Sequence, residues 1–145
     1  MGNYIENSFF LKMADKTTLL RAFNTHFFDF IDDILNIFPE NEDLKVTKIA
    51  LQTIKKANPT SILKAWQYFV FSPYRNVIED GNITFFFDKD YSADLNYMPN
   101  AKEIMGVIDQ LREPVRSMSD VNKSHSMKYI QNLSKLSNNY TELSK

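Results

Sequence analysis

The pattern of apolar and polar residues predicts a long amphipathic helix over residues 18–38. On a helical wheel, at about 100° per residue, almost all of its apolar side chains fall on one half, and the other half is rich in aspartate. Asp15 is suited to be the N-cap of this helix. Pro39 ends it, because proline cannot donate the next backbone hydrogen bond.

A second amphipathic helix is predicted over residues 43–57. Its apolar side, which we expect to face the core, consists of Leu44, Val46, Ile49, Ala50, Leu51 and Ile54. The other side is a narrow basic stripe of Lys45, Lys48, Lys55 and Lys56. Acidic residues at the start of this segment and lysines at its end match the helix dipole.

A third helix is predicted from Asn58-Pro59 to about Phe71, because asparagine is a good N-cap and proline fits the first helical turn. Its apolar stripe consists of Ile62, Leu63, Trp66, Phe69 and Val70. Tyr68 and Phe71 lie off that stripe. This helix is therefore either buried on nearly all sides or presents aromatic side chains to a partner.

Short helices are predicted for the middle of the chain. Ser72-Pro73 starts one that ends before Gly81, which is placed to close it in the left-handed conformation. Residues 83–87 have the composition of a strand, but the chain offers no convincing partner strand. We therefore favour a short helix capped by Asn82.

The C-terminal part of the chain predicts one helix with a clear apolar side, followed by a second helix with a weaker sequence signal. Pro99 opens the first, and Pro114 is expected to kink it. Its apolar side consists of Ala101, Ile104, Val107, Ile108, Leu111, Val115 and Met118. From Ser119 onward the chain is rich in serine and asparagine, which are poor helix formers. Even so, apolar residues recur there at helical spacing, namely Tyr129, Leu133, Leu136, Tyr140 and Leu143.

These patterns predict an all-α fold, a compact single-domain bundle of about five to seven helices. The length of 145 residues suits one domain. The predicted parts are an N-terminal segment (1–14), a helical domain (15–118) and a partly helical, Ser/Asn-rich C-terminal segment (119–145).

Composition removes several classes of function. The absence of cysteine excludes disulfides, thiolate metal sites and thiol nucleophiles. Three glycines are too few for a phosphate-binding loop, and a net charge of −1 gives no overall field toward nucleic acid or an anionic membrane. No apolar run is long enough to span a membrane, and the first residues lack the pattern of a signal peptide. We expect a protein that is not secreted.

The first predicted helix carries residue types that could hold a metal or act in catalysis. His26, Asp29 and Asp33 share one edge of it. About 10 Å of helix separates the first of these from the last, so one ion could reach only two of them. His26 and His125 also lack the sequence pattern of a catalytic triad. The residues favour a solvated acidic face.

A second acidic group follows the spacing of a calcium-binding loop: Asp88, Asp90, Ser92 and Asp94. Ala93 and Pro99 stand where such a loop needs glycine and glutamate. A capped turn is the better interpretation, since short polar side chains favour turns for their own reasons. We expect no metal and no cofactor.

The lysine stripe offers a possible nucleic-acid contact. Lys45, Lys48, Lys55 and Lys56 could follow a phosphate backbone, and binding would then weaken steeply with salt. Lysines are common on solvated helix faces, however, and the nearby acidic face would repel nucleic acid. Nucleic-acid binding, aided by the basic residues of 119–145, is therefore the alternative hypothesis.

Several stretches of the chain also carry a resemblance: residues 23–33 (FNTHFFDFIDD), 37–39, 55–59, Trp66 and 85–91 (FFFDKDY). Through them, residues 20–96 resemble small uncharacterised proteins of nucleocytoplasmic large DNA viruses, including relatives of the mimiviruses and the algal viruses. The resembling residues are helix boundaries and core positions. The resemblance implies a viral origin and assigns no activity.

The predicted function is a non-enzymatic viral structural or adaptor protein that binds other chains, viral or its own. A minor virion component comes first, a self-associating or host-protein-binding factor second. The expected location is the host-cell cytoplasm, the viral factory or the virion. Candidate partner-binding residues are Tyr68, Phe71, Tyr129, Leu133, Leu136 and Tyr140. The alternatives are a nucleic-acid-associated viral regulatory protein using the lysine stripe and basic tail, and a hydrolase using the carboxylates of residues 29–33 or 88–94.

Overall fold

The computed structural model describes the backbone of residues 3–88 and 98–145 and the side chains of residues 11–88 and 98–145. Within these ranges the fold is all-α, as predicted, and contains no strand. The α-helices are α1 (Asn3–Ile37), α2 (Glu42–Ala57), α3 (Ser61–Ala65), α4 (Arg75–Glu79), α5 (Ala101–Arg116) and α6 (Asp120–Leu143). Shorter elements are the π-helical η1 (Trp66–Phe71) and the 3-10 helices η2 (Ser72–Tyr74) and η3 (Ile83–Phe87).

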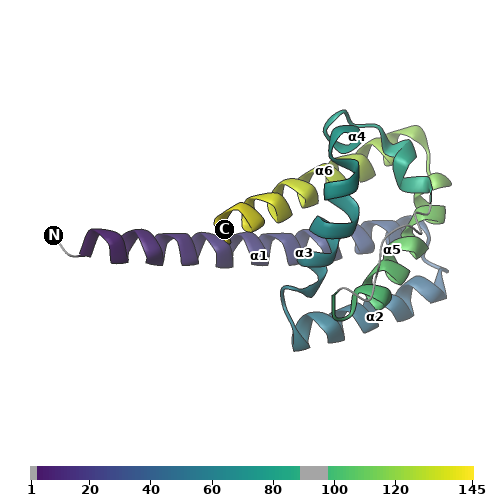
Figure 1. Ribbon diagram of the computed structural model, residues 1–145. Helices are drawn as coiled ribbons and strands as arrows, with labels where there is room; N and C mark the ends of the chain where they lie inside the picture. Colours follow the sequence, from purple (N-terminus) through teal and green to yellow (C-terminus); the bar gives the residue numbers. More distant parts are fainter. Residues whose placement is uncertain (1–2, 89–97) are drawn as a thin grey trace.

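The long helix α1 is the axis of the molecule (Figure 1). α6 packs along it, α2 folds back beside it, and α5 packs against α2. α3 and η1 join these layers by contacting α1, α5 and α6. The core therefore lies around the C-terminal part of α1, while its N-terminal part projects beyond the body (Figure 1).

Aromatic rings fill the centre of this core. Phe23, Phe27 and Trp66 are fully buried, and their ring centroids lie 6.1 to 6.5 Å apart. Full burial of a phenylalanine side chain stabilises a fold by about 1.5–3 kcal/mol relative to its exposure. Since phenylalanine is a middling helix former, packing more than intrinsic propensity stabilises this part of α1.

The first helix begins earlier than predicted. The sequence suggests Asp15 as its N-cap, but Asp15 lies exposed within α1, which starts at Asn3. Residues 3–14 of the predicted N-terminal segment are therefore part of the same helix as residues 15–37. At the other end the prediction is correct, because α1 ends just before Pro39.

The predicted bounds of α2 are correct to within one residue, and Asn41 is its N-cap, accepting a hydrogen bond from the Leu44 backbone N–H. The predicted orientation of the helix is wrong in part. Leu44 and Leu51 are fully buried, whereas Val46 and Ile49 are 64% and 63% exposed. The apolar residues of this helix cover more than half of its circumference, and α1 and α5 cover only one sector.

The third predicted helix starts later and changes character along its length. Asn58 caps a turn by accepting a hydrogen bond from the Thr60 backbone N–H, so Pro59 precedes the helix, which begins at Ser61. After Ala65 the chain widens into the π-helical η1. The side chains buried in η1 are Trp66, Phe69, Val70 and Phe71. The sequence left two interpretations open for this segment: burial on nearly all sides, or aromatic side chains presented to a partner. Burial describes most of it.

Residues 83–87 form the predicted short helix, η3. The Asn82 side chain caps it by accepting a hydrogen bond from the Thr84 backbone N–H at 3.1 Å. Gly81 has a φ of 75°, the left-handed conformation predicted for it. Capping residues and the lack of a partner strand are therefore better guides here than the strand-like composition.

Two arginines of α5 stabilise the end of η3. Arg112 donates to the carbonyls of Phe86 and Asp88, and Arg116 donates to the carbonyl of Phe87. Each guanidinium also lies over the corresponding ring, 5.2 and 5.5 Å from its centroid. These bonds satisfy carbonyl groups that the end of a short helix leaves unpaired. Pro114 stands between them in the sequence, in the last turn of α5, which continues to Arg116.

The C-terminal segment, predicted to be partly helical, is helical from Asp120 to Leu143. Ser119 is the N-cap of α6, accepting a hydrogen bond from the Asn122 backbone N–H. Ser126, Ser134 and Ser137 are buried, so the serines that weaken the helix signal are the small residues through which α6 meets its neighbours. Residues 119–145 thus belong to the same packed unit as the rest of the body.

Candidate functional site

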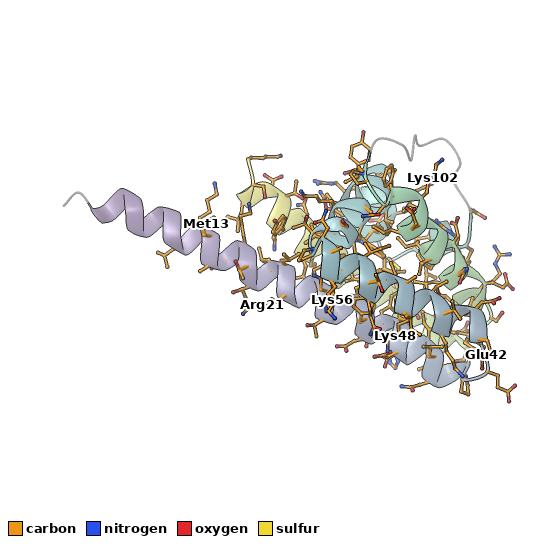
Figure 2. The ribbon with its side chains drawn as sticks, turned by 90° about the horizontal axis from the view of Figure 1, so that it is seen from below. Met13, Arg21, Glu42, Lys48, Lys56 and Lys102 are labelled. Atoms are coloured by element: carbon orange, nitrogen blue, oxygen red, sulfur yellow. The ribbon has the colours of Figure 1, made fainter. Side chains whose placement is uncertain are left out.

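The outward side of α2 carries an apolar surface that the rest of the described chain does not cover. We call it the outer face of α2, and it consists of Val46, Ile49, Ala50, Thr53 and Ala57, all exposed. These residues repeat at spacings of three and four, so they form one continuous stripe along the helix. α2 lies at the edge of the molecule (Figure 1) and in the foreground when it is seen from below (Figure 2). A contiguous apolar stripe at such a position is typical of a contact surface.

The N-terminal part of α1, residues 3–13, is a second candidate contact surface, which we call the arm. The C-terminal end of α6 reaches α1 at Lys12 and Lys16: the Lys12 ammonium contacts the Lys145 carbonyl, and the Lys16 ammonium lies 5.0 Å from the Tyr140 ring centroid. On the N-terminal side of Lys12, α1 projects past the body (Figure 1), whereas Met13, labelled in Figure 2, lies between the two contacting lysines. Leu11 and Met13 are 66% and 49% exposed.

Most of the predicted partner-binding residues are occupied within the chain. Leu133 is fully buried and Phe71 is 4% exposed, so neither is available to a partner. Tyr129, Leu136 and Tyr140 are partly buried against the core, because the seam of α6 packs along α1. The spacing of these residues correctly indicates a packing seam, but what it packs against belongs to the same chain.

Tyr68 remains accessible at the surface. It is 48% exposed, and its ring lies edge-on to Phe69 with 5.0 Å between centroids. The structure is therefore compatible with contact at Tyr68, which stays a prediction.

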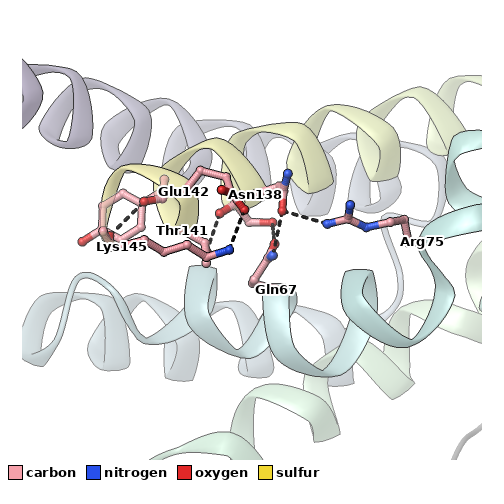
Figure 3. A network of polar contacts seen from close by, with 9 residues as sticks. Gln67, Arg75, Asn138, Thr141, Glu142 and Lys145 are labelled. Atoms are coloured by element: carbon pink, nitrogen blue, oxygen red, sulfur yellow. Dashed lines mark hydrogen bonds and ion pairs between the residues drawn. The ribbon is translucent and has the colours of Figure 1, made fainter.

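A polar network joins α6 to η1 and α4 (Figure 3). The Gln67 amide and the Arg75 guanidinium each donate to the Asn138 side-chain oxygen at 3.1 Å. The Ser137 hydroxyl donates to the side-chain amide oxygen, Oε1, of Gln67 at 2.8 Å. This part of α6 thus uses its polar groups to bind its own chain.

The lysine stripe is largely engaged in contacts within the chain. The Lys45 ammonium lies 3.0 Å from Glu42, and the Lys48 ammonium lies 2.5 Å from Asp32 of α1. The Lys55 ammonium lies 5.2 Å from the Phe28 ring centroid. Lys56 is exposed at the end of α2. Since two of the four charges are paired with carboxylates, the stripe is a poor match for a row of phosphates.

A small polar cluster forms where α1 meets α6. The Tyr129 hydroxyl donates a short hydrogen bond to the Asp33 carboxylate, and its ring stacks on Phe30 and lies 4.6 Å from the His26 ring. Burial, and after it the hydrogen bond and charge of Asp33, raises the pKa of Tyr129 to about 12. Burial lowers the pKa of His26 below its usual 6.5, against the opposing charges of Asp29 and Asp33.

These properties give the cluster little reactive character. A phenol whose pKa is raised stays protonated at neutral pH and serves as a hydrogen-bond donor. The Nε2 atom of His26 is buried without a hydrogen-bond partner among the described residues, so no neighbouring hydroxyl is placed for it to activate as a general base. The described part of the chain contains no group of three or more His, Asp or Glu residues able to hold a metal ion. Of the calcium-loop-like run, Asp90, Ser92 and Asp94 lie outside the described residues.

An open groove of about 690 Å³ lies between the α1–α2 turn and the end of α5. Ile37, Phe38 and Pro114 contribute apolar surface, and Glu40 and Glu113 contribute exposed carboxylates. The two carboxylates are exposed to solvent, so the groove is not an enclosed site that shields reacting groups from water.

The sequence interpretation did not identify the outer face of α2 or the arm. A signal for the first was present, because Val46, Ile49, Ala50 and Thr53 repeat with helical spacing on the side away from Leu44 and Leu51. The signal for the second is weaker, since Leu11 and Met13 precede the residue proposed as the N-cap.

Comparison with known proteins gives no match to a protein-family model, a curated protein or a solved structure. Among the described helices, none combines the length and apolar character that crossing a membrane requires.

Proposed function

We propose that the protein is a non-enzymatic structural or adaptor protein of viral origin, which acts by binding other protein chains. The observation that carries the proposal is the arm, a helical projection on which Leu11 and Met13 are 66% and 49% exposed. Apolar side chains exposed on a projecting helix lose contact with water when a partner covers them, and this burial favours binding. Its recognition mode is a helix laid into an apolar groove on the partner.

The chemistry of the polar groups supports a non-enzymatic function. The pKa of Tyr129 is raised to about 12 and Tyr129 is bonded to Asp33, so its phenol holds its proton at neutral pH. His26, the neighbouring titratable ring, has its pKa lowered by burial, and its Nε2 atom has no partner in the described residues. Neither group has the exposed, oriented geometry of a general base.

The viral part of the proposal rests on the resemblance of residues 20–96 to proteins of large DNA viruses. Within it, a minor virion component is the first form, and a factor of the host-cell cytoplasm or viral factory is the second. Mass spectrometry of purified particles distinguishes them. Detection of the chain at a constant ratio to a capsid protein supports the virion form, and its absence leaves the adaptor form.

Site-specific photo-crosslinking tests the proposal at the arm. A photoreactive amino acid at Met13, in the full chain produced during infection, is expected to give adducts of discrete mass that protease digestion removes. Placed at Glu103, which is exposed on α5, the same group is the matched control and is expected to give none of these adducts. Absence of protein adducts from Met13 contradicts the proposal, and nuclease-sensitive adducts favour the nucleic-acid alternative.

A further inference from the structure

We propose that the outer face of α2 is a self-association surface, through which two copies of this chain pair with their α2 helices antiparallel. The inference rests on the contact-making function proposed above, but it concerns a different surface and names the partner as a second copy.

The outer face of α2 is complementary to itself when one helix is reversed. A two-fold axis midway between Ile49 and Ala50 brings each position opposite the position equally far beyond the axis. Ile49 and Ala50 lie about 100° apart around the helix, on opposite sides of the stripe. At the axis, Ile49 therefore packs beside Ile49 of the second copy on one side of the contact and Ala50 beside Ala50 on the other, while Val46 faces Thr53 along the middle. The centre of the contact is therefore apolar on both sides, and the exposed isoleucine of each copy is covered by that of the other.

The charges at the two ends of α2 agree with the antiparallel arrangement. Glu42 and Lys56 are exposed at opposite ends of the helix, as Figure 2 shows. In the antiparallel pair Glu42 of each copy lies beside Lys56 of the second copy, on the same side of the contact. Within one chain Glu42 contacts Lys45 at 3.0 Å, an exposed ion pair that a second lysine can share.

A parallel arrangement is disfavoured by the same residues. It would place Glu42 beside Glu42 and Lys56 beside Lys56, and it would align the dipoles of the two helices. Like charges and parallel dipoles both repel. The antiparallel register is therefore the one that the surface specifies.

None of the described residues covers the outer face of α2. α2 lies at the edge of the body, and its contacts with α1 and α5 are made by the opposite side, where Leu44 and Leu51 are buried. A single pair of helices buries less surface than the roughly 1,600 Å² of a standard interface. We therefore expect a reversible dimer that dissociates on dilution.

Sedimentation velocity of the full chain over a concentration series tests the inference. The wild-type chain is expected to shift from monomer to dimer as its concentration rises, and Ile49→Glu is expected to remain monomeric. Val121→Glu is the matched control, because Val121 is equally exposed, at 64%, on α6. It is expected to dimerise like the wild type. Circular dichroism checks that each variant remains folded. A wild-type chain that stays monomeric, or an Ile49→Glu chain that still dimerises, overturns the proposal.

A charge-swap series tests the register. Glu42→Lys and Lys56→Glu each place like charges together across the contact, and each is expected to weaken dimerisation by about tenfold. The double variant, which carries both substitutions, again places opposite charges together and is expected to recover most of the wild-type affinity. A double variant as weak as the sum of the single ones overturns the antiparallel register.

The two proposals fail independently. If the chain dimerises but the photoreactive group at Met13 gives no protein adducts, the function proposed for the arm is wrong. Retention of Met13 adducts in a chain that never dimerises removes only the self-association.

Discussion

Trp66 donates its indole N–H to the hydroxyl of Ser134, with 3.1 Å between nitrogen and oxygen. Trp66 is fully buried and Ser134 is 1% exposed, so the bond lies inside the contact between η1 and α6. The serine contributes twice: its small size lets α6 approach the indole, and its oxygen accepts the hydrogen bond that a buried indole N–H needs.

The Trp66–Ser134 bond predicts a specific loss of stability. Ser134→Ala keeps the small volume but leaves the buried N–H without an acceptor, so we expect a loss of about 1–3 kcal/mol in the free energy of unfolding. Urea unfolding followed by the fluorescence of Trp66, the single tryptophan, measures it directly. Ser124→Ala, at an exposed position of the same helix, is expected to change little. Equal effects from the two variants would contradict the role given to the bond.

The Tyr129–Asp33 pair predicts a change in titration. Burial is the largest cause of the raised pKa of Tyr129, about 12, and the Asp33 carboxylate adds to it. Asp33→Asn removes that charge, so the pKa of Tyr129 is expected to fall part of the way toward the ordinary value of 10.0. The ring resonances of Tyr129, followed by NMR as the pH is raised, report it. An unchanged pKa would show that Asp33 does not act on the phenol.

His26 predicts that stability falls on mild acidification. Its folded-state pKa is lowered, so the unfolded chain, with a pKa near 6.5, binds a proton more tightly than the folded one. The His26 contribution is therefore constant well above pH 6.5 and decreases as the pH falls through that value. We expect the free energy of unfolding to be lower at about pH 5.5 than at about pH 7.5.

The matched variants for this pH effect are His26→Leu, which cannot take up a proton, and His125→Leu, which removes the other histidine of the chain. Only the first is expected to remove the decrease between the two pH values. If the decrease survives in His26→Leu, or disappears in His125→Leu, another group is responsible.

Much of the fold follows from local signals in the sequence. Asn82 and Gly81 bound η3 as predicted, and the end of α1 before Pro39 is correct, because caps and breakers act within a few residues. The helix predicted for residues 83–87 is also confirmed, since a strand needs a partner and the sequence offers none.

What the sequence did not predict depends on neighbours distant along the chain. In α2 the apolar residues cover too wide an arc to show which sector faces inward, and the positions of α1 and α5 decide that Leu51 is buried and Ile49 exposed. In α6 the serines lower intrinsic helix propensity, yet Ser134 and Ser137 are buried where small residues are needed. At these positions of α6, tertiary packing outweighs the intrinsic helix propensity of serine.

The integration of α6 into the core gives the last prediction. Leu133 is fully buried, so Leu133→Ala removes packed methyl groups and leaves a cavity, at an expected cost of about 2–5 kcal/mol in the free energy of unfolding. Leu11→Ala makes the same chemical change on the arm, where the side chain is 66% exposed, and is expected to stay within about 0.5 kcal/mol of the wild type. Thermal or urea unfolding of both variants measures the difference. If α6 were instead a dispensable tail that waits for a partner, the two substitutions would cost the same, and a chain ending at residue 118 would unfold with the wild-type midpoint. A large gap between them places residues 119–145 inside the cooperative unit.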